Sequence, residues 1–188
     1  MSPPMIESEN GEKEAILEAA KLMLATARTA PKSAGVDDIV TLIVYGEEKD
    51  AIADKMEQIA NERKIEAFKR DAMNVRESYA VVLIAVRGGK SLGLDCGCCG
   101  YKGCQEFDKA KKKLGRDFIG PTCIFKALDL GIALGSAAKT ASMLNIDNRI
   151  MYRVGTASSK LKLLPGATII MGIPVSVRGK NIYFDRSK

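Results

Sequence analysis

The sequence predicts a central sheet flanked by helices. Stretches with helical periodicity alternate with short β-branched runs and show no fixed repeat, which argues against a solenoid. Hydrophobic residues make up 46% of the chain and charged residues 28%, as in ordinary globular proteins. The length of 188 residues fits one domain spanning residues 1–188. A cysteine-rich segment, residues 87–123, is inserted within it.

The first half of the chain contains four predicted elements. Residues 12–28 repeat apolar side chains at helical spacing with acids in the first turn, and the helix should stop before Pro31. Residues 38–45 are short and β-branched, which predicts a buried strand. Residues 47–71 read as one long, charge-laced helix. Residues 79–86, Y-A-V-V-L-I-A-V, are the most hydrophobic strand candidate.

A glycine-rich loop beginning at Arg87 leads into the cysteines and the second half of the chain. The elements predicted there are helices at 105–114, 123–144 and 158–163, and strands at 150–154 and 167–173, the last ended by Pro174. Gly89-Lys90-Ser91 suggests a phosphate loop, but the first glycine of that motif would fall on Ile84. Gly131 and Gly135 lie within a helical pattern, where small residues allow close helix packing, including packing across a dimer.

Composition excludes several classes of function. The chain has no histidine, which rules out a Ser-His-Asp or Cys-His triad and an HExxH metal site. No stretch approaches the roughly 18 continuous apolar residues of a membrane span, and the start lacks a signal pattern, so we expect a cytoplasmic protein. In a reducing compartment, clustered thiols bind metal or do chemistry rather than form disulfides. Aromatic residues at 5% with no Trp argue against a nucleic-acid stacking surface.

The net charge of +6 is unevenly distributed. Residues 149–188 carry 8 Lys and Arg but only one acid, Asp185, and this stretch accounts for the whole surplus. Such a surface could attract an acidic protein, a phosphate-bearing cofactor or nucleic acid. It is equally compatible with an ordinary solvated surface.

Four of the five cysteines lie within the stretch D-C-G-C-C-G-Y-K-G-C, which begins at Asp95. Cys96, Cys99, Cys104 and Cys123 follow the spacing C-x2-C-x4-C-x18-C, and glycines come after the first two. Glycine-rich turns free backbone N–H groups to point at sulfur, which stabilises thiolates. Cys104 and Cys123 each begin a predicted helix, where the positive helix end lowers a thiol pKa.

Three interpretations of this quartet remain open. An iron–sulfur cluster uses four cysteines and tolerates unequal spacing. Structural zinc sites usually bring two C-x2-C pairs, and a redox dithiol needs an isolated C-x-x-C. The fifth cysteine, Cys98, is predicted to face out of the loop; the alternative is that it exchanges with Cys99 as a ligand.

The residues also resemble known families. D-C-G-C-C-G-Y-K-G-C-Q-E-F, followed by G-P-T-C, resembles the four-cysteine [4Fe-4S] module of corrinoid iron–sulfur proteins and of membrane-linked electron-transport subunits. A-A-K-L-M-L-A-T-A-R-T-A-P-K-S-A-G resembles the opening of nitroreductase-like proteins, D-L-G-I-A-L-G-S-A-A-K-T-A-S-M-L-N their long dimer-forming helix, and G-A-T-I-I-M-G-I-P-V their last core strand. The whole chain resembles the uncharacterised ferredoxin-domain proteins, which insert a four-cysteine module into a nitroreductase-like scaffold.

That resemblance implies an α+β fold, a homodimer, and FMN as a second cofactor. Arg28, Lys32 and Ser33 match the turn that holds the flavin phosphate or ring. The match is partial. Of the family's Arg-rich phosphate-binding site only Arg28 and Lys32 remain, and no Asn-x-Gln-Pro-Trp follows Pro31.

The leading hypothesis is an iron–sulfur protein that holds one [4Fe-4S] cluster and exchanges single electrons with a redox partner protein. A bound flavin fed by the cluster would make it a small flavin-dependent oxidoreductase. The alternative is a zinc-stapled binding module without catalysis, whose basic C-terminal region docks an anionic partner.

Overall fold

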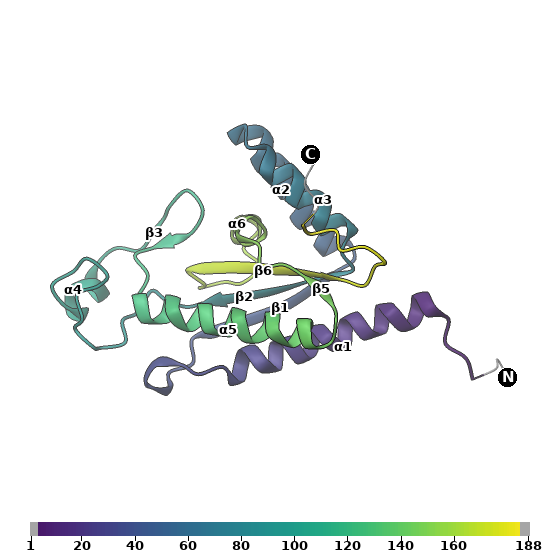
Figure 1. Ribbon diagram of the computed structural model, residues 1–188. Helices are drawn as coiled ribbons and strands as arrows, with labels where there is room; N and C mark the ends of the chain where they lie inside the picture. Colours follow the sequence, from purple (N-terminus) through teal and green to yellow (C-terminus); the bar gives the residue numbers. More distant parts are fainter. Residues whose placement is uncertain (1–3, 185–188) are drawn as a thin grey trace.

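Four antiparallel strands form the central sheet, in the order β1-β2-β6-β5 (Figure 1). They are β1 (Ile39–Tyr45), β2 (Ala80–Val86), β6 (Ile169–Ser176) and the short β5 (Asp147–Asn148). The computed structural model describes residues 4–184; Asp185, Arg186 and Lys188 of the basic C-terminal stretch therefore lie outside the described residues. The predicted α+β class, a sheet flanked by helices, is confirmed.

Helices cover both faces of the sheet. On one face lie α1 (Ser8–Thr29) and α5 (Ile124–Met143); on the other lie α2 (Glu47–Arg63), α3 (Glu66–Glu77) and α6 (Tyr152–Lys160) (Figure 1). Strand β2 runs through the middle, so that Val82 and Ile84 pack toward α1 and α5 while Val81 and Leu83 pack toward the opposite layer. Because both its faces are covered, β2 is a continuous hydrophobic run rather than an alternating one. Within residues 4–184, no helix is both long enough and apolar enough to cross a membrane.

Residues 87–123 leave the sheet after β2 and return at the start of α5. They carry the short helix α4 (Cys104–Lys109) and a separate hairpin of β3 (Lys113–Leu114) and β4 (Ile119–Gly120). The segment lies at the end of the molecule opposite to the start of α1 (Figure 1). One further short element, the 3-10 helix η1 (Ser33–Gly35), follows α1.

Two predicted helices have the wrong length. The helix predicted over residues 47–71 is two helices, because Lys64 adopts a left-handed backbone conformation (φ 56°) that ends α2. The turn lets α3 pack back along α2 and bury Phe68 with Met56 in one core. The helix predicted over 105–114 ends at Lys109. Beyond it, the ammonium of Lys112 donates to the Phe107 carbonyl (2.7 Å) and the chain continues into β3.

The strand predicted at residues 150–154 is wrong, and the helix predicted at 158–163 begins earlier, since α6 spans Tyr152–Lys160. The predicted last strand is right in kind, but Pro174 does not end it: β6 continues to Ser176. The Val175 carbonyl accepts from Tyr79 (3.2 Å), so the polar groups of Val175 face β2 and those of Pro174 face away. The missing N–H of Pro174 therefore leaves the β2–β6 ladder intact.

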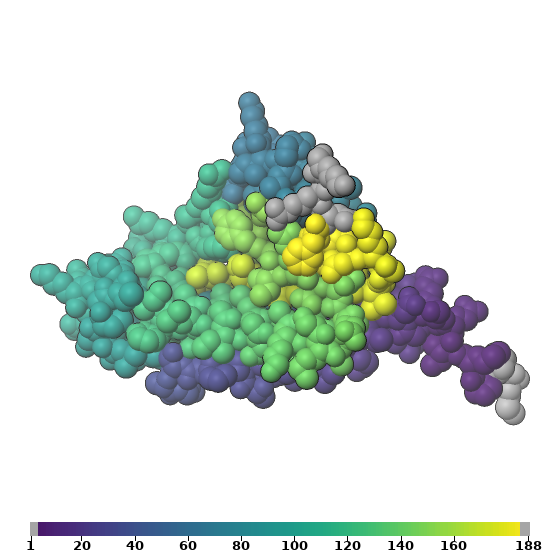
Figure 2. Space-filling model, viewed as in Figure 1, coloured from purple at the N-terminus to yellow at the C-terminus, as the bar shows by residue number. Residues whose placement is uncertain are grey.

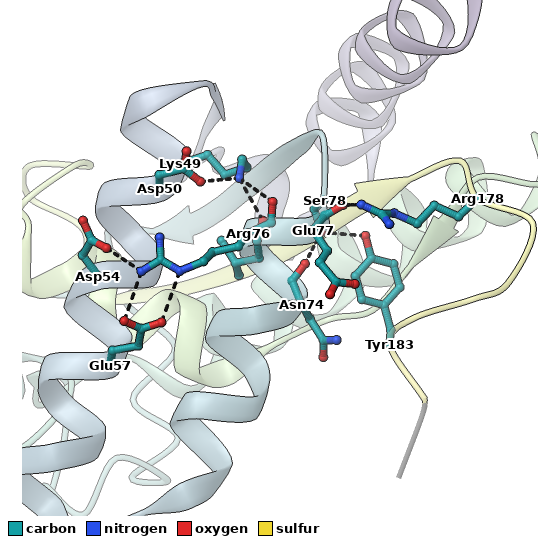
Figure 3. Close-up of polar contacts among 11 residues, drawn as sticks. Lys49, Asp50, Asp54, Glu57, Asn74, Arg76, Glu77, Ser78, Arg178 and Tyr183 are labelled. Atoms are coloured by element: carbon teal, nitrogen blue, oxygen red, sulfur yellow. Dashed lines mark hydrogen bonds and ion pairs between the residues drawn. The ribbon is translucent and has the colours of Figure 1, made fainter. Parts of the chain in front are cut away.

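The C-terminal end of α3 is secured by several donors from distant parts of the chain (Figure 3). The last carbonyls of a helix have no partner within it and need one elsewhere. The donors and acceptors are Lys49 Nζ to Val75 O (3.1 Å) and Arg76 O (3.0 Å), Ser78 Oγ to Asn74 O (2.6 Å), and Arg178 Nη2 to Glu77 O (2.7 Å). Ser78 also shares a hydrogen bond with the Tyr183 hydroxyl (2.8 Å), which ties the C-terminal segment to α3.

We expect Tyr183 to make the folding stability fall at alkaline pH. Burial raises the pKa of Tyr183 to about 12, whereas an unfolded tyrosine ionises near pH 10. The unfolded chain therefore loses this proton first, and stability decreases as pH rises from about 10 to about 12, by about 1.4 kcal/mol at about pH 11. Urea unfolding of the Tyr183→Phe variant should show this part of the decrease removed. Tyr45→Phe, at an exposed position, is the control and should keep it. An unchanged alkaline decrease in Tyr183→Phe would contradict this assignment.

Candidate metal centre

One pocket in the segment 87–123 is lined by four cysteines. They are Cys96, Cys99, Cys104 and Cys123, the four predicted ligands. Cys98 does not line this pocket and is exposed. The other lining side chains include the apolar residues Leu92, Leu94, Tyr101, Phe107 and Phe125. Two cysteines separated by 18 residues in the sequence thus reach the same space.

A tight turn explains how the first two cysteines of the quartet reach the pocket. Gly97 (φ 69°) and Gly100 (φ 83°) both have positive φ, and the Gly100 N–H donates to the Gly97 carbonyl (3.0 Å). Glycine adopts this conformation without steric strain. Cys96 precedes the turn and Cys99 lies within it. Cys98 also lies within the turn, but it is exposed and does not line the pocket.

The other two cysteines stand at the beginnings of helices, as the sequence predicts. Cys104 is the first residue of α4, and Cys123 is the N-cap of α5. The first backbone N–H of α5, that of Ile124, donates to Cys99 Sγ (3.3 Å). Because the N-terminus of the 20-residue α5 carries partial positive charge, it favours an anionic sulfur at this position.

The electrostatics of Cys99 reflect first its burial and then the nearness of other sulfurs. Burial raises the pKa of its thiol, the N–H of Ile124 acts in the opposite sense, and the neighbouring Cys123 and Cys96 raise the pKa further. Thiolates so close together repel one another unless a cation lies between them. Within residues 4–184, no group of three or more Cys, Asp or Glu side chains could hold a metal ion as the side chains stand.

Asp95 fixes the loop to α4, and the sequence interpretation missed it. Its carboxylate accepts from the Cys104 N–H (2.6 Å), and its own N–H donates to Cys104 Sγ (3.3 Å). Asp95 has a left-handed backbone (φ 45°), a conformation that Asp tolerates better than most residues. The signal in the sequence is only an Asp nine residues before the start of a helix, which is too distant for a capping motif.

The two ends of the segment 87–123 are joined by a hydrogen bond beside the sheet. The Cys123 N–H donates to the Gly88 carbonyl (2.9 Å), and the Gly88 N–H donates to Thr168 Oγ1 (3.0 Å). A Cβ on Gly88 would lie 2.3 Å from the Thr122 methyl group and 2.8 Å from Thr168 Oγ1, so a larger residue here would displace these side chains. Farther out, Asp117 in the hairpin pairs with Arg63 of α2 (2.5 Å). The cysteine segment is therefore anchored to the core at several points.

Two comparisons identify the relatives of this chain. Residues 119–186 match the family described as "Uncharacterized protein containing a ferredoxin domain (DUF2148)". A protein of Archaeoglobus fulgidus, described as "Uncharacterized protein", is 47% identical over 183 residues, covering 97% of this chain and 98% of its own length. The chain belongs to this ferredoxin-domain family. The family match includes Cys123 but not the other three cysteines of the pocket.

Solved structures similar to the ferredoxin-domain protein include nitroreductases. A nitroreductase with bound FMN from Desulfitobacterium hafniense has a TM-score of 0.54 at 13% identity, with 94% of this chain and 80% of that chain covered. Nitroreductase A from Vibrio parahaemolyticus has a TM-score of 0.51 at 13% identity, with coverage of 96% and 63%. At this identity the likeness shows the fold alone, and the predicted nitroreductase-like scaffold is confirmed.

The residues predicted to hold a flavin in the ferredoxin-domain protein all have partners within the chain. Arg28 pairs with Asp37, and Lys32 donates to carbonyls at the end of α1 (2.9 and 3.2 Å). Ser33 donates through its N–H and its hydroxyl to the buried carboxylate of Asp129 in α5 (3.0 and 2.8 Å). The structure therefore brings these three residues together at the α1–η1 junction, where they close the end of α1 and attach it to α5.

Proposed function

We propose that this protein is a single-electron carrier that holds one [4Fe-4S] cluster on Cys96, Cys99, Cys104 and Cys123. The observation that carries the proposal is the single pocket lined by these four cysteines and not by Cys98. The backbone N–H groups that point at Cys99 and Cys104 support it, because cluster thiolates are stabilised by such donors. Membership of a ferredoxin-domain family indicates a redox function.

The chain's own residues would bind, orient and shield the cluster, which when bound supplies one-electron chemistry. The apolar side chains of Leu92, Phe107 and Phe125 line the pocket and limit its access to water. Low polarity and N–H donors are the two features by which a protein adjusts a cluster potential. The exposed Cys96 places one wall of the pocket at the molecular surface, where an electron can enter or leave.

The proposal is tested on protein purified without oxygen. We expect a brown protein with broad absorption near about 400 nm and about four irons and four acid-labile sulfides per chain. One zinc per colourless chain would instead support the zinc-stapled binding module, and no metal at all would overturn both functions.

We expect Asp95 to slow the loss of the cluster. In Asp95→Ala the bond to the Cys104 N–H is lost and the left-handed backbone is strained, so iron release to a chelator should be faster by roughly 10- to 100-fold. The matched control is Asp95→Asn, which keeps an acceptor oxygen and tolerates the same backbone. It should stay close to the parent protein. Equal release rates in Asp95→Ala and the parent would contradict this role.

FMN is the second candidate cofactor, favoured by the fold shared with a nitroreductase that has bound FMN. Binding at Arg28, Lys32 and Ser33 would require a phosphate to compete with Asp37 and with the carbonyls that end α1. A yellow compound with flavin fluorescence, released on denaturation, would support an oxidoreductase in which the cluster feeds the flavin. If the protein contains no flavin after reconstitution with FMN, the electron-carrier function would stand without the flavin-dependent oxidoreductase.

We also propose a homodimer formed through α1 and α5. Their outer surfaces expose Leu22, Leu128, Ile132 and Met143, and Gly131 and Gly135 lie on the same exposed side of α5. Large apolar side chains grouped in this way are typical of subunit interfaces. Sedimentation equilibrium should give twice the chain mass; a monomer at micromolar concentration would contradict the dimer. The cytoplasmic location stays a prediction.

A further inference from the structure

The cysteine segment itself carries a positive surface that overall composition conceals. Residues 87–123 contain eight Lys and Arg against four Asp and Glu. The space-filling view shows this segment, here called the lobe, at one end of the molecule (Figure 2). An oxidised [4Fe-4S] centre with four thiolates would offset roughly two of these charges from inside the pocket. The surface of the lobe would remain positive.

The four acids of this segment are already engaged. Three of them accept backbone N–H groups of the segment: Asp95 from Cys104 (2.6 Å), Glu106 from Lys102 (2.9 Å) and Asp108 from Ser91 (2.6 Å). The fourth, Asp117, pairs with Arg63. Four lysines of the segment are exposed and form no ion pair with any residue between 4 and 184: Lys102, Lys109, Lys111 and Lys113.

The positive surplus of the sequence lies in the C-terminal stretch, residues 149–188. Several arginines of this stretch interact with groups of the same chain. Arg149 donates to the Tyr183 carbonyl (2.8 Å), Arg153 pairs with the buried Asp71 (2.7 Å), and Arg178 donates to the Glu77 carbonyl (2.7 Å). These arginines stabilise the fold. Three charges of this stretch are therefore engaged, whereas Lys102, Lys109, Lys111 and Lys113 of the cysteine segment remain exposed and, among residues 4–184, unpaired.

The pocket reaches the surface within this positive lobe. Leu94 and Cys96 both line the pocket, and Leu94 is 51% exposed while Cys96 is also exposed. A small apolar contact beside a redox centre, with charges around it, suits brief docking, since charge guides the approach and little area must separate afterwards. A surface for single-stranded nucleic acid typically offers exposed aromatic rings for base stacking, but Tyr101 packs edge-on against the buried Phe107.

We propose that the exposed face of residues 87–123 docks an acidic electron-carrier protein. The inference rests on the proposed function and specifies its partner by charge. In the step, one electron leaves the reduced carrier, which is oxidised, and enters the cluster, which is reduced. No bond or proton needs to move.

Binding of oxidised flavodoxin, an acidic electron carrier, to the anaerobically purified chain tests the proposal. The variant Lys109→Gln/Lys111→Gln/Lys113→Gln removes three charges from the lobe. Its control, Lys21→Gln/Lys69→Gln/Lys160→Gln, removes three exposed charges elsewhere. We expect the lobe variant to bind about tenfold more weakly and the control to change less than about twofold. Binding to the parent chain should also weaken between about 20 and about 300 mM NaCl.

A second readout follows the electron. Reduced flavodoxin should reduce the lobe variant more slowly than the parent, while dithionite, a small reductant that needs no docking surface, should reduce both at the same rate. Unchanged iron content and circular dichroism would show that the variant is folded.

Three results would overturn the docking proposal: binding insensitive to salt, equal weakening in the lobe and control variants, or tighter binding of a short DNA duplex than of flavodoxin. A chain without iron that still binds flavodoxin through the three lysines would overturn the electron-carrier function alone. An iron-loaded chain whose binding ignores these lysines would overturn the docking surface alone.

Discussion

We expect replacing Cys99 with serine to remove the visible absorption and the bound iron, and replacing its neighbour Cys98 to leave both unchanged. The two residues are adjacent in the sequence, but only Cys99 lines the pocket and accepts the Ile124 N–H at its sulfur (3.3 Å). Serine is a poor ligand for iron in a cluster that is otherwise held by thiolates. We expect Cys99→Ser to retain less than about a tenth of the iron of the parent protein.

The comparison is measured by iron and sulfide content and by absorption spectra of Cys98→Ser and Cys99→Ser, prepared without oxygen. Near-UV and far-UV circular dichroism separates cluster loss from unfolding. Loss of the cluster in Cys98→Ser with retention in Cys99→Ser would exchange the two ligands and contradict our assignment. Retention in both variants would remove the cluster from this loop altogether.

We expect replacing Gly155 with alanine to destabilise the protein by about 3 kcal/mol or more. A Cβ at position 155 would lie 1.7 Å from the Ile170 carbonyl oxygen and 2.5 Å from the carbonyl carbon. Both atoms belong to the backbone of β6 and cannot rotate away. The contact is reinforced from the other side, where a Cβ on Gly172 would lie 2.1 Å from a methyl group of Val154. Helix α6 can therefore stay on the sheet only if glycine occupies both positions.

The control is Gly11→Ala, also within a helix, where an added Cβ would meet only the Ile6 Cγ2 methyl group at 3.4 Å, an ordinary van der Waals contact. Because alanine favours helix over glycine, this variant should be more stable by up to about 1 kcal/mol. Urea unfolding followed by far-UV circular dichroism measures both. A Gly155→Ala protein as stable as the parent would mean that α6 does not approach β6 so closely.

Local patterns in the sequence predicted most of the sheet and the grouping of the cysteines. The run from Ala80 to Val86 is apolar at every position, and a strand covered on both faces needs that composition. The cysteine spacing with glycines at 97 and 100 predicted the turn, because positive φ at these positions favours glycine. Both signals are contained within a few neighbouring residues.

The sequence predicted the wrong element where distant residues decide the local conformation. Nothing near Lys64 signals the end of α2, which the packing of α3 against α2 favours. Residues 152–154 resemble a strand in isolation, yet they begin α6, because Gly155 and Gly172 allow a helix to lie directly on β6. Asp95 holds Cys104 through a loop whose shape no local rule predicts.

The sequence alone determined that any centre here must be built on cysteine: four cysteines at short, glycine-flanked spacing and a fifth at position 123 are present, and the chain has no histidine for a triad or an HExxH site. Only the tertiary structure decided that the four cysteines line one pocket, that Arg28, Lys32 and Ser33 are used within the chain, and which lysines of the cysteine segment stay unpaired within the described residues. The physical reason is that spacing reports on short-range backbone geometry. Which charges and donors find partners depends on contacts between segments up to about a hundred residues apart, such as Ser33 with Asp129.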